Sequence, residues 1–438
     1  MDYDSINTVI PALGEAKILS PIRVREDSRV YGRQFVSDEE RVIADTDLNA
    51  LKKRIQEGKP VSSFEKAGHR EKIYFDPSKL RCALVTCGGL CPGLNDIIRA
   101  IVLELYHCYG VKNIYGIRYG LQGFVPEYGH NVVDLRPESV VNIHEMGGTI
   151  LGSSRGEQSI VEITDSLERM NIGILFMIGG DGTLRAADRI ADEITERGMK
   201  TSIVSVPKTI DNDIHLVSRS FGFHTAVDLA TNAIRAAHRE AEGYLNGIGL
   251  IKLMGRNSGF IAATATLAQQ DVNFTLIPEA DFDMEAFLTA LENRLTSRKH
   301  AVIVVAEGAG QKFFKDEDVG HDESGNRRLG DIGAFLKKEI AAYFGKKVTL
   351  KYIDPSYMIR SLPANANDNV YCSYLGRDAV HAGMAGKTRL LISRWNGEFV
   401  HVPMSASLGM EGHKQIDREG KLWSGVLEAT GQGALKKS

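Results

Sequence analysis

The chain has 438 residues, with 53 Lys plus Arg against 56 Asp plus Glu and a formal net charge of −3. This balance gives no support for nucleic-acid binding as the main task. No window of about 20 apolar residues predicts a membrane-spanning helix, and a hydrophobic content of 43% excludes a disordered low-complexity chain. The 44 glycines instead predict tight turns and close approaches of the backbone to a ligand.

The five cysteines are an odd and sparse set, which indicates a reducing compartment. Met1 to Lys17 contains acids and lacks the apolar core of a signal peptide. Cys87 and Cys91 are spaced C-x3-C without a second ligand pair nearby, so we interpret them as buried thiols rather than zinc ligands. We therefore expect a cytoplasmic protein with no membrane partner and no nucleic-acid partner.

Residues 1–79 are more polar than the rest of the chain. One helix is expected near Asp47 to Glu57, with Asp47 as its N-cap. We interpret residues 1–79 as an N-terminal extension that packs on the main body.

From residue 80 onward, short apolar runs alternate with helical stretches. The runs are nearly continuous in Val, Ile, Leu or Ala, which is typical of strands buried on both faces. They are Cys82 to Cys87, Asn113 to Arg118, Ile172 to Ile178, Ser202 to Val206, Gly247 to Leu253, Val272 to Ile277, Ala301 to Ala306 and Val348 to Ile353. One helical stretch has a single apolar face, made by Val227, Ala230, Ile234, Ala237 and Ala241.

This alternation predicts an α/β fold with parallel-rich sheets covered by helices. Eight strands fit two doubly wound, Rossmann-like domains better than a closed eight-stranded barrel, which is the architectural alternative. In doubly wound sheets, ligands bind at the carboxyl ends of the strands. The residues that follow each strand are therefore the candidate site.

Glycine-rich turns follow the first and third runs. Cys87-Gly88-Gly89 and Pro92-Gly93 come before a helix, so backbone amides could approach an anion there, although a plain tight turn is the alternative. Gly179-Gly180-Asp181-Gly182-Thr183 also comes before a helix, which disfavours a hairpin. A carboxylate among glycines suits a phosphate site with Asp181 as a ligand of Mg²⁺, a hard cation that prefers oxygen ligands.

The fourth run ends at Pro207-Lys208-Thr209-Ile210-Asp211-Asn212-Asp213. Phosphoryl transfer needs a base for the attacking hydroxyl and positive charge near the transferred group. Asp211 and Lys208 could supply both. The alternative is a polar turn without catalytic chemistry.

Three further strand ends carry charge. Arg256 follows Met254-Gly255, Glu307 precedes Gly308, and Tyr357 to Arg360 follows the last run. Arginine offers a bidentate fork for a phosphate, and glutamate can accept hydrogen bonds from sugar hydroxyls. Each residue alone is more typical of a surface or an ion pair, but their recurrence at strand ends favours a binding site.

Taken together, these segments resemble the phosphofructokinase family. The matching segments appear in family order: Cys87-Gly88-Gly89 with Pro92-Gly93-Leu94-Asn95, Gly147 to Gly156, Gly179 to Thr183, Pro207 to Asp213, Met254-Gly255-Arg256, Ile277-Pro278-Glu279, Val305 to Gly308, and Tyr352 to Arg360. The ensemble is specific, although Gly-Gly-Asp-Gly-Thr alone is also similar to NAD and lipid kinases.

The resemblance implies phosphorylation of carbon 1 of fructose 6-phosphate, with Mg²⁺ as cofactor and ATP as co-substrate. It implies an ATP-binding domain of residues 80–222 with about 361–403, and a fructose 6-phosphate-binding domain of residues 223–360 with about 404–438. It also implies a homotetramer, with a dimer as the alternative, and makes regulation by a nucleotide plausible.

The resemblance also assigns roles to residues. Asp211 is the expected general base, and Lys208 and Arg155 are expected to stabilise charge on the transferred group. The expected nucleotide-phosphate residues are Gly89, Arg155, Gly156, Gly180, Asp181, Gly182 and Thr183, with Asp181 at the metal. The expected substrate residues are Thr209, Ile210, Asp211, Met254, Gly255, Arg256, Glu307, Tyr357 and Arg360.

Two positions bear on the phosphoryl donor. Pyrophosphate-using members of the family place an Asp where this chain has Gly182, so Gly182 points to ATP. Lys208 is typical of the pyrophosphate users, so the chain resembles an atypical ATP-dependent branch that is similar to them in sequence. Pyrophosphate-dependent transfer is the nearest alternative. A NAD or lipid kinase and a non-catalytic nucleotide sensor are more distant ones.

Overall fold

The computed structural model describes residues 6–22, 35–314, 320 and 328–436. The chain divides into two compact units. The first comprises Met1–Thr209, Ile214–Phe221 and Pro363–Glu411, and the second comprises Ile210–Asp213, Gly222–Leu362 and Gly412–Ser438. The sequence interpretation gave Ile210–Asp213 to the first domain, but these residues are grouped with the second unit. It gave residues 404–411 to the second domain, but these are grouped with the first unit. There, helix α13 (Met404–Leu408) follows strand β15 (Glu398–Pro403) and packs on helix α5 (Asp181–Glu196).

A nine-stranded mixed sheet forms the centre of the first unit, in the order β2-β3-β15-β14-β9-β8-β5-β6-β7. The strands are β2 (Arg41–Ile43), β3 (Ser63–Lys66), β5 (Arg81–Thr86), β6 (Asn113–Ile117), β7 (Val133–Asp134), β8 (Ile174–Gly179), β9 (Ser202–Pro207), β14 (Leu390–Trp395) and β15 (Glu398–Pro403). The five strands β6-β5-β8-β9-β14 are parallel. The strand order reverses between β5 and β8, and a ligand crevice is expected at the carboxyl ends beside such a switch point.

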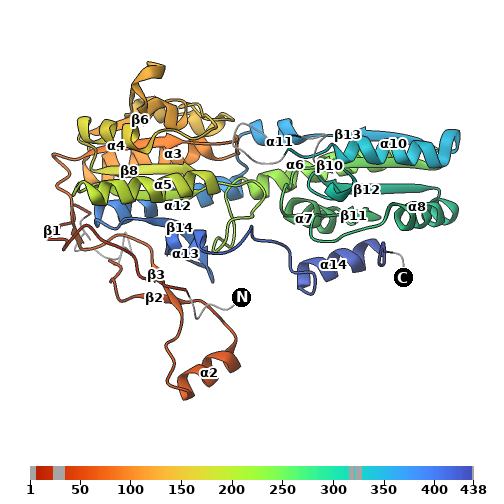
Figure 1. The fold of residues 1–438 in the computed structure, drawn as a ribbon, viewed down its shortest axis with the longest axis horizontal. Helices are drawn as coiled ribbons and strands as arrows, with labels where there is room; N and C mark the ends of the chain where they lie inside the picture. The colour runs from red at the N-terminus through yellow and green to blue at the C-terminus, as the bar shows by residue number, and fades with distance from the viewer. Residues whose placement is uncertain (1–5, 23–34, 315–319, 321–327, 437–438) are drawn as a thin grey trace. The chain divides into compact units, whose positions relative to one another are not determined.

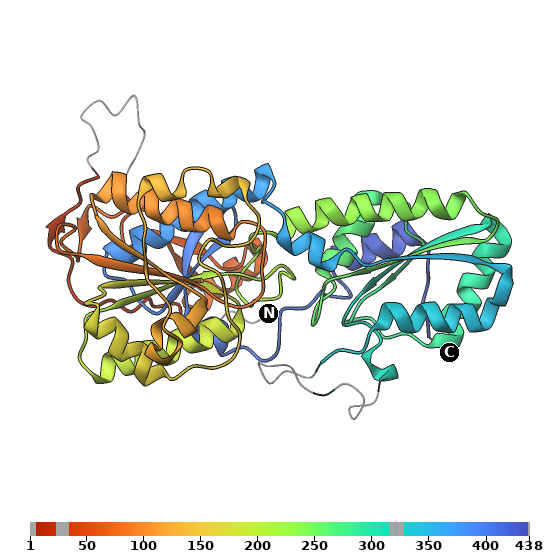
Figure 2. The same ribbon diagram turned by 90° about the horizontal axis from the view of Figure 1, so that it is seen from above.

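Helices cover both faces of this sheet (Figure 2). Alternate residues of β8, such as Leu175 and Met177, pack with Ile163 of α4 (Ile160–Arg169) and Ile190 of α5 (Asp181–Glu196). Helices α3 (Leu94–Leu103) and α12 (Ala366–Met384) pack together on the other face. Both faces of the central strands are therefore buried, which explains their continuous apolar sequences.

The N-terminal segment is built into this unit (Figure 1). Its helix α2 (Leu48–Gln56) is capped by Asp47, as expected. Strand β3 pairs with β15, and its Glu65 binds Arg70, Lys387 and His401 at 2.9–3.3 Å. Burial alone would raise the pKa of Glu65, but these partners outweigh it and lower the pKa to about 2. This buried charged cluster therefore holds residues 63–70 against the rest of the sheet.

The remaining short elements of the first unit lie at its periphery or in its loops. They are β1 (Ile18–Leu19) paired with β4 (Lys72–Ile73), a π-helical segment Glu104–Tyr109, and 3-10 segments Gly120–Phe124, Pro126–Tyr128, Pro137–Val140 and Ile143–Glu145.

The second unit has a four-stranded parallel sheet in the order β11-β12-β10-β13. These strands are β10 (Gly247–Leu253), β11 (Phe274–Leu276), β12 (His300–Ala306) and β13 (Thr349–Ile353). Its helices are α6 (Phe223–Glu242), α7 (Phe260–Gln269), α8 (Met284–Arg298), α10 (Ile332–Phe344), α11 (Ser356–Ser361) and α14 (Lys421–Thr430), with 3-10 segments Gln311–Phe313 and Gly345–Lys347.

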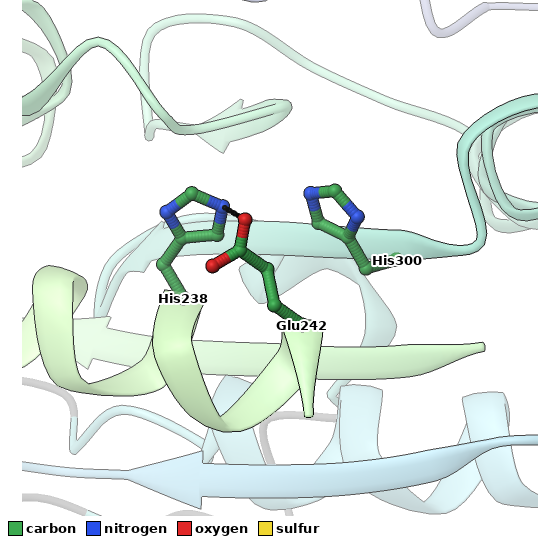
Figure 3. Close-up of side chains that lie close together, drawn as sticks. All are labelled: His238, Glu242 and His300. Carbon is green, nitrogen blue, oxygen red and sulfur yellow. Dashed lines mark ion pairs between the residues drawn. The ribbon is translucent and has the colours of Figure 1, made fainter. Parts of the chain in front are cut away.

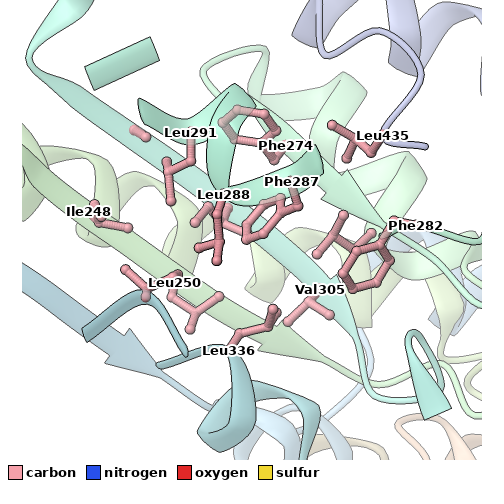
Figure 4. Packing of buried hydrophobic residues seen from close by; sticks show 14 of the residues in the cluster. Ile248, Leu250, Phe274, Phe282, Phe287, Leu288, Leu291, Val305, Leu336 and Leu435 are labelled. Atoms are coloured by element: carbon pink, nitrogen blue, oxygen red, sulfur yellow. The ribbon is translucent and has the colours of Figure 1, made fainter. Parts of the chain in front are cut away.

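Figure 4 shows the apolar core of this sheet against α8 and α10. Ile248 and Leu250 of β10 point into this core with Phe287 and Leu291 of α8. The intervening Gly249 faces α6, where an added Cβ would lie 2.8 Å from the Ala237 carbonyl oxygen. Glycine therefore allows α6 to lie close against β10.

The predicted α/β fold with parallel-rich sheets is confirmed. Each of the eight apolar runs overlaps a strand, and the stretch around Val227 to Ala241 lies in α6. The sequence interpretation missed the antiparallel hairpin β14–β15, whose turn is Asn396-Gly397, with φ of 48° and 90°. Among the helices that the structure describes, none combines the length and apolarity needed to cross a lipid bilayer.

Candidate active site

In the first unit, the carboxyl ends of β5 and β8 meet a loop at Ser153-Ser154. The Cys87 amide donates to the Ile178 carbonyl oxygen at 2.9 Å, which joins the two strand ends. The Gly88 amide donates to the Ser154 carbonyl oxygen at 3.2 Å, and Ser153 Oγ donates to the Gly88 carbonyl oxygen at 2.6 Å. Gly88 has a φ of 80°, which favours glycine. These contacts fix the glycine turn at the switch point of the sheet.

Lys208 lies at this turn with 6% exposure. Its backbone amide donates to the Gly179 carbonyl oxygen at 2.9 Å, and its Nζ donates to the Gly89 carbonyl oxygen at 2.7 Å. The structure therefore brings the predicted charge-stabilising residue Lys208 together with Gly89 and Gly180, two of the predicted phosphate-site residues. A cation held here lies where an anion would enter the crevice.

Helix α5 begins directly after β8, with Gly180 as its N-cap and Asp181 as its first residue. An added Cβ at Gly179 would lie 2.1 Å from Thr183 Oγ1, so glycine is needed for this sharp turn. Gly182 is exposed, and an added Cβ there would have nothing within 4 Å. The helix N-terminus is favourable for an anion, and the space beside Gly182 is open to one.

Arg155 and Gly156 follow Ser153-Ser154 and are exposed. Ser153 and Ser154 bond to Gly88 of the glycine turn, so Arg155, the next residue, lies beside this turn. Its guanidinium is available to a ligand from solvent.

In the second unit, Asp211 lies against the carboxyl end of β10. Its Oδ2 accepts a hydrogen bond from the Arg256 amide at 3.2 Å, and its carbonyl oxygen accepts one from Ser258 Oγ at 3.2 Å. Burial raises the pKa of the Asp211 carboxyl to about 8, and the negative charges of Asp213 and Glu307 act in the same direction. The Arg256 amide and the Arg360 charge oppose this shift. A buried carboxylate with a raised pKa has the properties of a general base.

The loops after β10 and β12 pack backbone against backbone. The Glu307 amide donates to the Leu253 carbonyl oxygen at 2.9 Å, and the Gly308 amide donates to the Gly255 carbonyl oxygen at 3.0 Å. An added Cβ at Gly308 would lie 1.8 Å from the Arg256 carbonyl oxygen. Glycine at this position therefore lets Glu307 and Arg256 lie at one edge of the sheet.

Burial raises the pKa of Glu307, against the positive charges of Lys252, Arg256 and Arg360. Arg360 lies on the short helix α11 and packs over the Tyr357 ring, 4.9 Å from its centre. Tyr357 is 79% exposed. The second unit thus gathers one carboxylate and two arginines with Asp211, and leaves an aromatic ring open to solvent.

The other predicted substrate residues are less exposed. Ile210 and Met254 are 7% and 8% exposed. The Thr209 carbonyl oxygen accepts a hydrogen bond from Ser220 Oγ. Thr209 and Ile210 lie where the chain passes from the first unit to the second.

Sequence reasoning missed Lys414 and Lys252. The Lys414 amide donates to the Asp213 carbonyl oxygen at 2.8 Å. Burial lowers the pKa of Lys414 to about 8, although the Asp213 charge opposes that shift. Lys252 Nζ lies 2.9 Å from Asp354 and 3.1 Å from Asp331. Neither lysine has a local motif, because its partners come from distant parts of the chain.

The sequence pattern of the family described as Phosphofructokinase matches residues 81–383. The chain is 53% identical over 387 residues to the ATP-dependent 6-phosphofructokinase of Borreliella burgdorferi, covering 86% of each chain. It is 44% identical over 434 residues to the ATP-dependent 6-phosphofructokinase of Amycolatopsis methanolica, covering 96% of this chain and 94% of that one.

The fold is similar to that of the pyrophosphate-dependent phosphofructokinase of Marinobacter aquaeolei, with a TM-score of 0.66 and 21% identity. The match covers 82% of this chain and 92% of that one. The matched family segment spans both glycine turns and the strand ends that carry Asp211, Arg256 and Glu307. The chain therefore belongs to the phosphofructokinase family.

Proposed function

We propose that this protein is an ATP-dependent 6-phosphofructokinase. It transfers the γ-phosphoryl group of ATP to the 1-hydroxyl of fructose 6-phosphate, giving fructose 1,6-bisphosphate and ADP, a reaction of glycolysis. The observation that carries the proposal is the position of Asp211. It is a buried carboxylate with a raised pKa, and it lies at the carboxyl ends of β10 and β12 with Arg256 and Glu307. The relatives named above as ATP-dependent 6-phosphofructokinases support the same reaction.

Asp211 takes the proton from the 1-hydroxyl of the sugar. As this happens, the oxygen of this hydroxyl attacks the γ-phosphorus of ATP, in line with the oxygen of the leaving ADP. No covalent enzyme intermediate is formed. The burial that raises the pKa of Asp211 makes its carboxylate a stronger base than an exposed one. The Arg256 amide, which donates to Oδ2, holds the carboxylate in place.

On the phosphate side, backbone amides of Gly89, Gly180 and Gly182 and the side chain of Thr183 bind the nucleotide phosphates. Lys208 and Arg155 stabilise the charge that develops on the transferred group, and Gly156, next to Arg155, also binds the nucleotide phosphates. Asp181 would hold Mg²⁺, which usually takes one or two protein carboxylates together with substrate phosphate oxygens and neutralises their charge. The partly exposed carboxylate beside open space at Gly182 fits that ion.

On the sugar side, Arg256 and Arg360 bind the 6-phosphate through their guanidinium groups. Glu307 accepts hydrogen bonds from sugar hydroxyls. The substrate is further lined by Tyr357, Met254 and Gly255 and by the backbone of Thr209 and Ile210. Lys208 and Asp211 are three residues apart, so their Cα atoms lie within roughly 11 Å. This short link allows the charge-stabilising lysine and the base to act on one reaction.

The open space at Gly182 favours ATP as donor, because a longer side chain there would meet the nucleotide. We also propose a cytoplasmic homotetramer, on family resemblance, with size-exclusion chromatography coupled to light scattering as its test.

The direct test is to incubate the purified protein with fructose 6-phosphate, Mg²⁺ and either ATP or pyrophosphate, and to measure fructose 1,6-bisphosphate. We expect product with ATP. Product with pyrophosphate alone would instead support the pyrophosphate-dependent alternative. An absence of product with either donor would contradict the proposed function.

The loss of kcat/KM at acid pH, which is the acid limb of the pH profile, should follow the protonation of Asp211. Because the base must be deprotonated, kcat/KM for fructose 6-phosphate should fall as the pH drops through the raised pKa, far above the usual value near 3.8. Asp213→Asn removes a negative charge that raises this pKa, so the limb should move down by on the order of one pH unit. The same change at exposed Asp281 is the control. An unchanged limb in Asp213→Asn would show that another group controls it.

A further inference from the structure

A cluster of two imidazoles and a carboxylate lies in the second unit, away from the residues discussed above. His238 and Glu242 are one turn apart at the end of α6, and His300 is the first residue of β12. One ligand atom from each of the three residues lies within 4.8 Å of the other two. Figure 3 shows that both rings turn a nitrogen toward the Glu242 carboxylate. We propose that His238, Glu242 and His300 bind one divalent transition-metal ion, with Zn²⁺ as the representative.

The outer contacts of both histidines favour metal binding through Nε2. His238 Nδ1 lies 3.3 Å from Asp271 Oδ2, and His300 Nδ1 lies 3.2 Å from the Arg298 carbonyl oxygen. An acceptor at Nδ1 holds the proton there and leaves the Nε2 lone pair for a metal. Histidine ligands of metal ions almost always have such a carboxylate or carbonyl partner. These contacts are therefore a second observation, independent of the three-residue cluster.

The spacing of the cluster suits a tetrahedral ion. Zn–N and Zn–O bonds of about 2.0–2.2 Å at tetrahedral angles give ligand-to-ligand distances of about 3.4 Å. The His238 Nε2 to Glu242 Oε1 distance is 3.4 Å. Since the widest pair is within 4.8 Å, side-chain adjustments of roughly 1.4 Å or less complete the three ligands. Water would supply the fourth.

The surrounding charges leave the ligand atoms available. Arg239 binds the other Glu242 oxygen, Oε2, at 2.6 Å, which leaves Oε1 facing the histidines. The side chains of His238 and Glu242 are 12% and 36% exposed, so an ion can enter from solvent.

The donor set separates this site from a magnesium site. Two imidazoles with one carboxylate suit Zn²⁺, Co²⁺ or Ni²⁺, whereas Mg²⁺ prefers oxygen ligands alone. The site also lies at the amino end of β12. With a rise of about 3.3 Å per residue, His300 is about 23 Å from Glu307 along the strand. A bound ion would link the last turn of α6 to the start of β12 and stabilise the second unit.

The test uses the full-length protein after dialysis against a chelator. We expect one Zn²⁺ per chain by equilibrium dialysis, a Co²⁺ absorption spectrum of tetrahedral type, and a rise in melting temperature with Zn²⁺ that equimolar Mg²⁺ does not produce. Absence of bound zinc, or an equal rise with Mg²⁺, would overturn the proposal.

Single variants locate the ion. Glu242→Gln and His300→Gln should each weaken Zn²⁺ binding by at least tenfold and abolish the Co²⁺ spectrum. Asp271→Asn, which alters only the outer contact, should weaken binding by roughly tenfold. His107→Gln, at an exposed histidine of the first unit, should bind as the parent does. Equal zinc affinity in the parent and in both ligand variants, checked for native circular dichroism, would place the ion elsewhere and refute the site.

Discussion

Asp211→Asn should lower kcat by about 10²- to 10⁴-fold, the usual contribution of a general base. Asn has the shape of Asp and keeps an oxygen for the Arg256 amide, which donates to Asp211 Oδ2 at 3.2 Å. It removes the group that accepts the proton from the sugar hydroxyl. Steady-state kinetics with ATP and fructose 6-phosphate, together with direct measurement of ATP binding, would show a loss of turnover with nucleotide affinity nearly intact.

Asp228→Asn is the matched control, because Asp228 is exposed on α6 and undergoes the same chemical change. Its kinetics should equal those of the parent protein. If Asp211→Asn retained turnover within a few fold, another group would be the base. If both variants lost activity equally, the loss would reflect a general effect of charge removal.

Gly182→Asp should reduce kcat/KM for ATP by on the order of 10²-fold. A carboxylate about 5 Å from a nucleotide phosphate costs roughly 3 kcal/mol at an effective dielectric constant near 20. The fold itself should tolerate the change, because a Cβ at Gly182 would have nothing within 4 Å. An acidic residue in the first turn of α5 is also favourable for the helix dipole. We therefore expect a melting temperature that is unchanged or raised, alongside the loss of ATP use.

Gly182→Ala separates bulk from charge. It adds only a Cβ into open space and replaces glycine with a better helix former, so its ATP kinetics should stay close to those of the parent. Unchanged ATP kinetics in Gly182→Asp would refute the steric and electrostatic basis for the donor assignment. Equal losses in both variants would assign the effect to bulk alone.

The sequence predicted most of the parallel strands because strands such as β8 and β12 are buried along nearly their whole length, so their apolar pattern is continuous and local. Its omissions have physical causes. Strand β3 contains Glu65, whose burial is stabilised by nearby Arg70 and by Lys387 and His401 from the other end of the chain. Its polar sequence therefore did not look like a buried strand. The hairpin β14–β15 did have a local signal in Asn396-Gly397, since an Asn-Gly turn adopts the positive φ angles observed there.

The sequence by itself determined the fold class and the glycine turns at strand ends, because buried strands and sharp turns impose local residue types. It also placed Lys208 and Asp211 three residues apart. Only the tertiary structure decided the environment of each group. The raised pKa of Asp211 depends on its burial, on the neighbouring Asp213 and on Glu307, almost a hundred residues away, and the His238–Glu242–His300 cluster joins α6 to β12. Burial and charge act through space, so residues distant in the chain help to set them and a local pattern records only part of them.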